Sequence, residues 1–220
     1  MTAAVDDDGR VRCAWIDRSR LAPADYLLYR DYHDTEWGRP LRDSAALFER
    51  ISLEAFQSGL SWLVILRKRD NFRRAFHGFD AERVARYTDR DVDRLMSDTG
   101  IVRNRAKIEA TIANARAVAA LDDSGVDLAE LLWSFAPADR AERARPVDIS
   151  HVPAVTPEST AMAKELKRRG FRFVGPTTAY ALMQATGMVD DHTADCWVPA
   201  TSPAPSPRAL AGSLHTNRPR

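Results

Sequence analysis

The feature that most constrains this chain is a set of four possible metal ligands near its two ends. The only cysteines are Cys13 and Cys196, and they can be grouped with His33 and His192 respectively. His192 and Cys196 are four residues apart and would share one face of a helix. A Cys₂His₂ set suits a closed tetrahedral zinc site, which is usually structural. The spacing of Cys13 and His33 fits no common zinc finger, so two unrelated cysteines and two ordinary histidines remain an alternative.

Length and composition place the chain among globular proteins. With 220 residues and 45% hydrophobic side chains, it can form one domain or two closely packed lobes around a substantial core. No apolar stretch approaches the roughly 18 residues of a membrane span, and residues 1–10 contain no apolar signal region. We therefore expect a cytoplasmic protein without a membrane partner. In such a reducing compartment, two distant cysteines favour a thiol or metal role over a disulfide.

Apolar residues recur with helical periodicity, which predicts an all-α chain. The clearest segment starts at Asp43, a helix-capping residue, and runs to about Ser58. Shorter helices can begin at Asp80 or Thr88, and an alanine-rich helix is expected over 101–121. Residues 136–155 read as a loop, after which helices are expected over 157–169 and up to Gly187, with a turn between them. We expect a flexible N-terminus over 1–10, a domain of two helical lobes over 11–199 and a disordered tail over 200–220.

A carboxylate lies on the apolar face of the helix that follows Asp43. Leu47 and Ile51 define that face, and Glu54 follows them by seven and three residues. A buried carboxylate is costly unless it is paired, and its pKa tends to rise, so Glu54 is a candidate functional residue. The alternative is a glutamate at the edge of the apolar stripe that pairs with a nearby arginine.

Aromatic residues are concentrated in the first forty residues, where they accompany the first two metal candidates. Trp15, Tyr29, Tyr32 and Trp37 lie there, and Trp62 follows the Glu54 helix. Such residues are often simply part of a core, yet a metal that held His33 would also fix the adjacent Tyr32. A cage for a flat base is therefore a second interpretation.

The charge pattern leaves nucleic-acid binding open. A net charge of +1 does not indicate a nucleic-acid partner, but three segments, 61–76, 101–116 and 164–172, are locally basic. They could form one phosphate-facing surface or be solvated helix faces that acidic neighbours balance. Between the last basic helix and the next one lies a turn with Gly175. A helix N-terminus there would present backbone N–H groups to a phosphate.

The chain contains several separated motifs that resemble, in the same order, those of DNA-3-methyladenine glycosylase I over about residues 11–199. They are RCAWID from Arg12, YRDYHDTEWG from Tyr29, SLEAFQSGLSW from Ser52, GIVRNRAKI from Gly100, KRRGFRFVGPTTAYALMQATG from Lys167 and VDDHTADCW from Val189. The resemblance implies a helix-hairpin-helix glycosylase fold, and a structural Zn²⁺ held by Cys13, His33, His192 and Cys196. It also implies a base pocket of Trp15, Tyr29, Tyr32, Glu54 and Trp62, with Trp37 a weaker candidate.

The same resemblance implies base-excision repair of 3-methyladenine in double-stranded DNA, with Glu54 as the catalytic candidate. We expect a monomer, because no coiled-coil pattern suggests an obligate dimer. Related bifunctional enzymes use a lysine that would fall at Thr177, so strand cleavage through a Schiff base is excluded. Gln57 and Leu60 could fill the gap that a flipped nucleotide leaves. Asp190 either stabilises charge on the sugar or caps a helix beside a metal ligand. The alternatives are a zinc-stabilised DNA-binding module without catalysis and a glycosylase for another alkylated purine.

Overall fold

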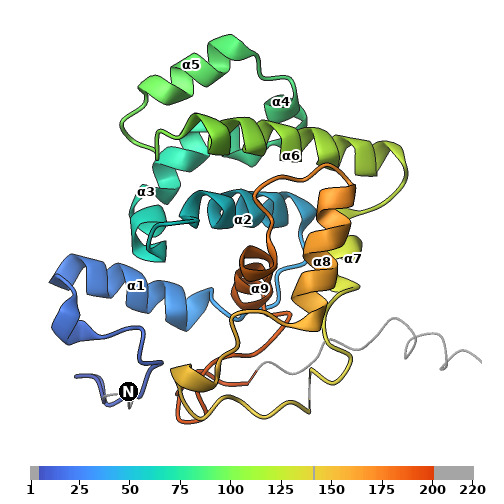
Figure 1. Cartoon of the computed structure of the whole chain (residues 1–220). Helices are drawn as coiled ribbons and strands as arrows, with labels where there is room; N and C mark the ends of the chain where they lie inside the picture. Colours follow the sequence, from blue (N-terminus) through green and yellow to red (C-terminus); the bar gives the residue numbers. More distant parts are fainter. Residues whose placement is uncertain (1–4, 141, 201–220) are drawn as a thin grey trace, which may run out of the picture.

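The computed structural model describes residues 5–140 and 142–200, and these form a helical protein (Figure 1). Within them, the β-structure is limited to one isolated bridge between Val5 and Val11. The prediction of an all-α fold is confirmed. The α-helices are α1 (Pro23–Thr35), α2 (Ser44–Gln57), α3 (Trp62–Ala75), α4 (Ala81–Ala85), α5 (Asp89–Ser97), α6 (Arg105–Asp123), α7 (Leu128–Trp133), α8 (Pro157–Arg168) and α9 (Pro176–Ala185). Short 3-10 helices are η1 (Arg18–Arg20), η2 (His77–Phe79) and η3 (Ile149–His151).

Side-chain caps set most helix starts. The Asp43 side chain accepts the N–H of Ala46, so α2 begins as the sequence predicts. A capping box at Thr156 opens α8. The prediction for α6 was wrong by one turn, because Asn104 caps the helix by accepting the N–H of Lys107. Residues 101–104 therefore form the connection that leads into α6.

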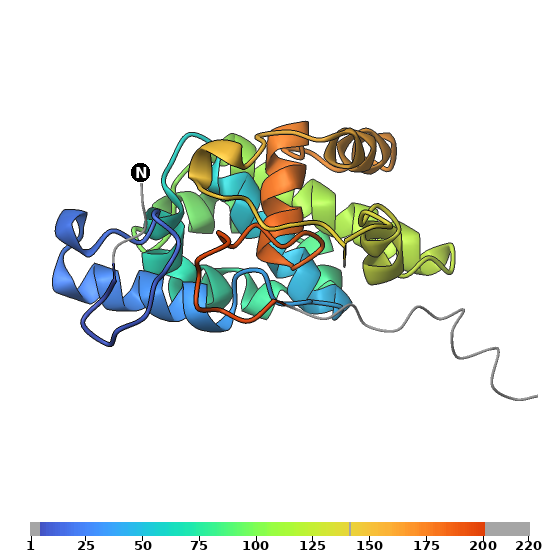
Figure 2. The ribbon, with the colours of Figure 1, turned by 90° about the horizontal axis from the view of Figure 1, so that it is seen from below.

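Helices α2 and α9 form the centre of the molecule. Residues 51–56 of α2 are all buried, and α2 packs against α3, α6, α7 and α9. Helix α9 runs between α2 and α8, which Figure 2 shows from a second direction. One apolar cluster extends from Tyr32 on α1 to Val189 beyond α9. The division of this domain into two lobes stays a prediction.

The N-terminal segment contacts the body of the protein through Arg12, whose side chain is buried. Its guanidinium pairs with Asp6, Asp8 and Asp34 at 2.7–2.8 Å. We expected residues 1–10 to be flexible; residues 5–10 make these contacts, and residues 1–4 lie outside the described part. The predicted disordered tail, residues 200–220, also lies outside the described part, apart from residue 200.

Candidate active site and metal centre

The four cysteine and histidine side chains from the two ends meet in one buried cluster. Their ligand atoms all lie within 4.8 Å of one another. Cys13 Sγ is 3.6 Å from His192 Nδ1, and Cys196 Sγ is 3.5 Å from both His33 Nε2 and His192 Nδ1. In a tetrahedral zinc site, with Zn–S about 2.3 Å and Zn–N about 2.0 Å, sulfur and nitrogen ligands stand roughly 3.5 Å apart. The cluster could therefore hold a metal ion, and the alternative of unrelated side chains is wrong.

Neighbouring groups orient both imidazoles toward the cluster. His33 Nδ1 is 2.8 Å from the Asp34 carboxylate, which leaves Nε2 directed at the sulfur atoms. His192 Nε2 is 3.2 Å from the Trp37 carbonyl oxygen, which leaves Nδ1 directed at them. Such outer partners fix the tautomer and raise the basicity of a metal-binding histidine.

The two thiols are too close to ionise together without a cation. The neighbouring Cys196 sulfur, and then burial, raises the pKa of the Cys13 thiol. The hydrogen bond from Cys13 lowers the pKa of the Cys196 thiol. Without a cation one of the two thiols is thus held in its neutral form, and a metal ion would favour the thiolate form of both.

Two glycines let the chain approach this cluster closely. Gly38 has a φ of +76°, and a Cβ there would lie 2.9 Å from His192 Nε2. Gly187 has a φ of +68°, and a Cβ there would lie 2.6 Å from the Gly38 carbonyl oxygen. Any larger residue at either position would move the α1–α2 connection away from His192 and from the end of α9.

A small aromatic pocket lies next to the metal cluster. Its volume is about 130 Å³, and it is open to solvent on one side. Every residue predicted to bind the base lines it, together with one of the two proposed wedge residues. The lining comprises Trp15, Tyr29, Tyr32, Trp37, Glu54, Gln57, Trp62, Ala181 and Gln184.

Glu54 supplies the only carboxylate of this pocket. Its side chain is 5% exposed, and among the described residues no hydrogen bond or ion pair reaches it. Burial raises the pKa of Glu54 to about 7, although the positive charge of Arg50 opposes this effect. The indole Nε1 of Trp62 is likewise buried without a hydrogen-bond partner. The pocket therefore contains one acceptor that the protein itself does not satisfy, and one of its wall residues holds a buried donor without a partner.

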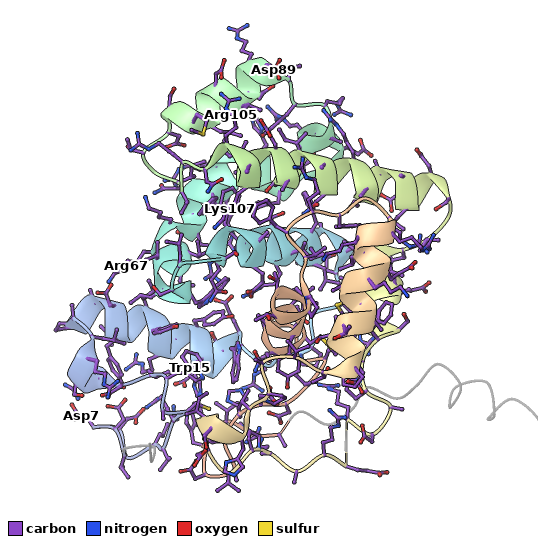
Figure 3. The ribbon with its side chains drawn as sticks, in the orientation of Figure 1. Asp7, Trp15, Arg67, Asp89, Arg105 and Lys107 are labelled. Atoms are coloured by element: carbon purple, nitrogen blue, oxygen red, sulfur yellow. The ribbon has the colours of Figure 1, made fainter. Side chains whose placement is uncertain are left out.

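The aromatic walls connect the pocket to the metal cluster. Trp15 packs edge-on against Tyr29, with ring centroids 4.9 Å apart, and against Trp37 at 5.2 Å. The Trp37 ring in turn lies 4.7 Å from the His192 ring. Figure 3 shows Trp15 beside the C-terminal part of α1. A metal that fixes the two histidines would thus also fix the rings that form the pocket.

Comparisons with known proteins agree with this geometry. A family model described as methyladenine glycosylase matches residues 23–199. This chain belongs to the methyladenine glycosylase family. It is 44% identical over 185 residues to the DNA-3-methyladenine glycosylase of Haemophilus influenzae, covering 84% of this chain and 96% of that protein.

Solved structures show the same fold. A crystal structure of 3-methyladenine DNA glycosylase I has a TM-score of 0.78 and 46% identity, over 84% of this chain and 98% of the other. The Staphylococcus aureus enzyme, studied for its recognition of 3-methyladenine, has a TM-score of 0.78 and 35% identity, over 87% and 98%. The described helices also include none long and apolar enough to cross a membrane.

In this methyladenine glycosylase, the turn between α2 and α3 forms part of the pocket rim. Gln57 lines the pocket, whereas Leu60 lies outside it and is 40% exposed. Lys107 of α6 donates to the carbonyl oxygens of Phe56 and Ser58, which holds the turn in place (Figure 3). Leu60 is therefore an exposed apolar side chain on an anchored turn.

The α8–α9 hairpin has the predicted outline and a firm attachment. Gly170 ends α8 with a φ of +92°, and Gly175 precedes α9 without a side-chain cap. The buried Asn114 of α6 accepts the Arg172 N–H at 2.7 Å and donates to its carbonyl oxygen at 3.2 Å. These bonds hold the turn against α6. The first N–H groups of α9, which directly follow this turn, have no side-chain cap.

The three basic segments do not form one uniform positive surface. On α3, Arg67 pairs with Asp25, Arg69 with Glu36 and Arg73 with Glu49. The alternative of balanced helix faces is therefore correct for α3. In the hairpin, Lys164, Lys167 and Arg172 are exposed, and none of them forms an ion pair with the described residues. Positive charge without an acidic partner is thus found beside α9.

Asp190 lies beside the metal cluster and does not line the aromatic pocket. Its carboxylate pairs with Arg145 at 2.9 Å and accepts the N–H of His192 at 3.3 Å. No helix starts there among the described residues, so the aspartate orders a turn and caps no helix.

Sequence reasoning missed two contributors to the pocket. Gln184 reaches it from α9, where its amide nitrogen donates to Asp191 at 2.7 Å. Arg50 contacts two residues that line the pocket and is 8% exposed. Both carried a signal: Gln184 is polar within an apolar helix, and Arg50 precedes Glu54 by four residues and so shares its face.

Proposed function

We propose that this protein is a monofunctional DNA glycosylase that flips 3-methyladenine out of duplex DNA and hydrolyses its N-glycosidic bond, leaving an abasic site. The observation that carries the proposal is Glu54, a buried carboxylate without a hydrogen bond or ion pair among the described residues, in a pocket walled by aromatic rings. A cation with a flat apolar face satisfies such a site best. An N3-methylated adenine in DNA is that kind of group.

The methylated base needs little acid catalysis. Its positive charge already weakens the glycosidic bond, and the base departs as a neutral molecule. The enzyme's main task is selection, because the nucleotide must leave the stack and enter a tight pocket. Aromatic faces attract a desolvated cation by about 2 kcal/mol, an attraction that neutral adenine lacks.

Each wall of the pocket has a proposed role. The rings of Trp15, Tyr29, Tyr32 and Trp62 stack on or border the base. The Glu54 carboxylate accepts hydrogen bonds from the edge of the base and opposes its charge. After the bond breaks, the same carboxylate faces the positive charge that develops on the sugar, which makes Glu54 the proposed catalytic residue.

The hairpin and the α2–α3 turn are the proposed DNA contacts. The N-terminus of α9 and its neighbouring cations suit a backbone phosphate. Leu60 and Gln57, at the turn between these helices, would fill the gap in the duplex. Thr177, in the first turn of α9, carries a hydroxyl that forms no Schiff base, so the strand stays intact after base release.

The metal cluster is the proposed structural clip. Cys13, His33, His192 and Cys196 would hold one Zn²⁺, which supplies a cross-link between the two ends of the chain. Four protein ligands complete a tetrahedral shell, so no position remains for water or substrate. The clip would fix His33 next to Tyr32, and would fix His192 against Trp37.

The direct test is release of free base from duplex DNA methylated with a radiolabelled methyl group. Wild-type protein is expected to release 3-methyladenine and to leave strands that break only on treatment with alkali. Glu54→Gln should lower the release rate by about 100-fold or more, because a preorganised charge is lost. Glu49→Gln, on the same helix, is the matched control and should retain activity.

Other outcomes would decide against the proposal. DNA binding without any base release would indicate a non-catalytic DNA-binding module. Faster release of 3-methylguanine or another alkylated purine would change the substrate. Equal rates for wild type and Glu54→Gln would remove Glu54 from the mechanism. Sedimentation of the protein with and without DNA tests the expected monomer.

A further inference from the structure

Arg50 is a buried cation without a carboxylate of its own. It lies on α2, one turn before Glu54, and is 8% exposed. The nearest carboxylate oxygen, on Glu36, is 3.5 Å away. That carboxylate already binds Arg69 through two hydrogen bonds of 2.6 and 2.8 Å. Burying an arginine with so little compensation is costly, so a purpose beyond packing is expected.

The guanidinium of Arg50 contacts two walls of the base pocket. Its Nη1 donates a hydrogen bond of 2.8 Å to the Tyr32 hydroxyl oxygen. Its central carbon lies 5.4 Å from the centre of the Tyr32 ring and 5.3 Å from the centre of the Trp62 ring. Arg50 therefore contacts two residues that line the pocket, although it does not line the pocket itself.

The hydrogen bond from Arg50 determines what the Tyr32 hydroxyl can do. A guanidinium only donates, so it occupies an acceptor site of the oxygen and leaves the hydroxyl proton to be donated elsewhere. No acceptor for this proton is found among the described residues. Tyr32 and Glu54 line the same pocket, so the proton is available to an acceptor atom of the base or to the carboxylate.

Among the described residues, Arg50 is also the charged side chain whose positive charge favours the Glu54 anion and lowers the pKa of that carboxyl, against the effect of burial. The other titratable groups around the pocket are Tyr29 and Tyr32 on α1, Glu36 directly after α1, Glu49 on α2, and Arg69 and Arg73 on α3. Arg69 and Arg73 are paired with Glu36 and Glu49. The pocket residues on α9, Ala181 and Gln184, are uncharged, as is Trp15.

We propose that Arg50 is a positioning residue of the base pocket, which directs the Tyr32 hydroxyl proton toward the bound base and stabilises the ionised form of the Glu54 carboxylate. This inference rests on the proposed function for its kinetic consequence. It assigns the Tyr32 side of the pocket a donor and the Glu54 side an acceptor. A purine with an acceptor facing Tyr32 and a donor facing Glu54 is preferred over one with the reverse pattern.

The test is the pH dependence of kcat/KM on a duplex that contains 3-methyladenine. In wild type, kcat/KM should rise with pH around a midpoint near the pKa of Glu54, about 7. Arg50→Met removes the charge while keeping the apolar volume, and should move the midpoint up by about one pH unit. Arg50→Lys keeps the charge but not the planar donor, so it should leave the midpoint in place and lower kcat.

A double variant separates the two parts of the proposal. At alkaline pH, where Glu54 is ionised in every variant, Arg50→Met should still lower kcat through Tyr32. In a Tyr32→Phe background this remaining loss should vanish, because the two residues then act through a bond that is already absent. An unmoved midpoint in Arg50→Met would overturn the electrostatic part. An undiminished loss in the Tyr32→Phe background would overturn the hydroxyl part.

Folding and function are checked separately. Thermal unfolding and metal content show whether each variant is folded, and Arg50→Gln, which also removes the charge, serves if Arg50→Met is not. The pKa of Glu54 can also be read without DNA from its carboxyl ¹³C chemical shift, assigned with Glu54→Gln. A higher pKa of Glu54 in Arg50→Met supports the inference even if no base is released. An unchanged pKa overturns it even if the glycosylase activity is confirmed.

Discussion

The metal cluster and the base pocket lie side by side but differ in how their polar groups are satisfied. In the cluster, each imidazole has an outer partner, Asp34 for His33 and the Trp37 carbonyl for His192. In the pocket, the Glu54 carboxylate has no hydrogen bond or ion pair among the described residues. The indole nitrogen of the wall residue Trp62 is buried without a hydrogen-bond partner. The first region needs only a metal ion for completion. The second needs a ligand from outside, which is what a binding site requires.

The two regions share their aromatic residues, so the rigid one positions the open one. Trp37 contacts His192 on one side and Trp15 on the other, and Trp15 contacts Tyr29 in the pocket wall. Preorganised walls reduce the entropy that binding a base would cost. We therefore expect changes in the cluster to damage both regions, and changes in the pocket to damage only one.

The largest effect, on both zinc content and the free energy of unfolding, is expected when one ligand of the cluster is removed. Cys196→Ala removes one ligand and leaves Cys13 and two histidines as an incomplete site, so zinc affinity should collapse. Loss of a structural metal is among the few single changes that cost more than about 4 kcal/mol in the free energy of unfolding. Metal analysis of purified protein should find one zinc per chain in wild type and much less in the variant.

The matched control is Val198→Ala, which shortens a buried side chain packed with Cys13 and Cys196 and leaves all four ligands in place. It should be destabilised by packing loss alone and keep its zinc. If Cys196→Ala unfolds at the same temperature as Val198→Ala, the metal does not stabilise the fold. If wild type contains no zinc after purification without chelators, the clip is wrong.

The next largest effect is a gain in the free energy of unfolding when the charge of Glu54 is removed. The pKa of Glu54 is raised from 4.5 to about 7, so unfolding releases a proton between these values. Above about pH 7, ionised Glu54 thus lowers the free energy of unfolding by roughly 3 kcal/mol, at about 1.36 kcal/mol per pKa unit. Glu54→Gln should therefore be more stable than wild type at about pH 8, by up to that amount.

The stability difference between Glu54→Gln and wild type should depend on pH in one direction. The advantage of Glu54→Gln should shrink as pH falls from 7 to 4.5, because Glu54 is protonated in both folded and unfolded protein below that range. Denaturant unfolding at several pH values measures it. Glu49→Gln loses the ion pair with Arg73 and should show no such gain. A constant difference at all pH values would mean that Glu54 does not titrate as proposed.

Local patterns predicted the elements and one buried charge. The caps at Asp43 and Thr156 and the face shared by Leu47, Ile51 and Glu54 depend on neighbouring residues only, so periodicity was sufficient. The meeting of Cys13 with His192 depends on the whole fold. Chemistry could suggest it, whereas spacing could not establish it, because the residues are far apart in sequence.

Charge was where sequence reasoning had least to work with. Arg67 and Arg69 of α3 pair with Asp25 on α1 and Glu36 directly after it. These acids are far from α3 in the sequence, so a local count cannot find the compensation. Arg50 shows the opposite case. It occupies the same helix face as Glu54, yet its burial became meaningful only with Tyr32 and Trp62 in place around it.

The smallest expected effect concerns Leu60, on the rim of the pocket. Leu60→Ala should change the free energy of unfolding by less than about 0.5 kcal/mol, because the side chain is 40% exposed. Binding to a duplex with an abasic analogue should weaken by about 10-fold if the side chain fills the gap, since the lost contact with the bases is worth roughly 1–2 kcal/mol. Leu27→Ala on α1, where the side chain is 47% exposed, is the matched control and should bind DNA normally. Equal affinity for both variants would leave Leu60 without a part in base flipping, and the pocket would then depend on its unsatisfied polar groups alone to capture the base.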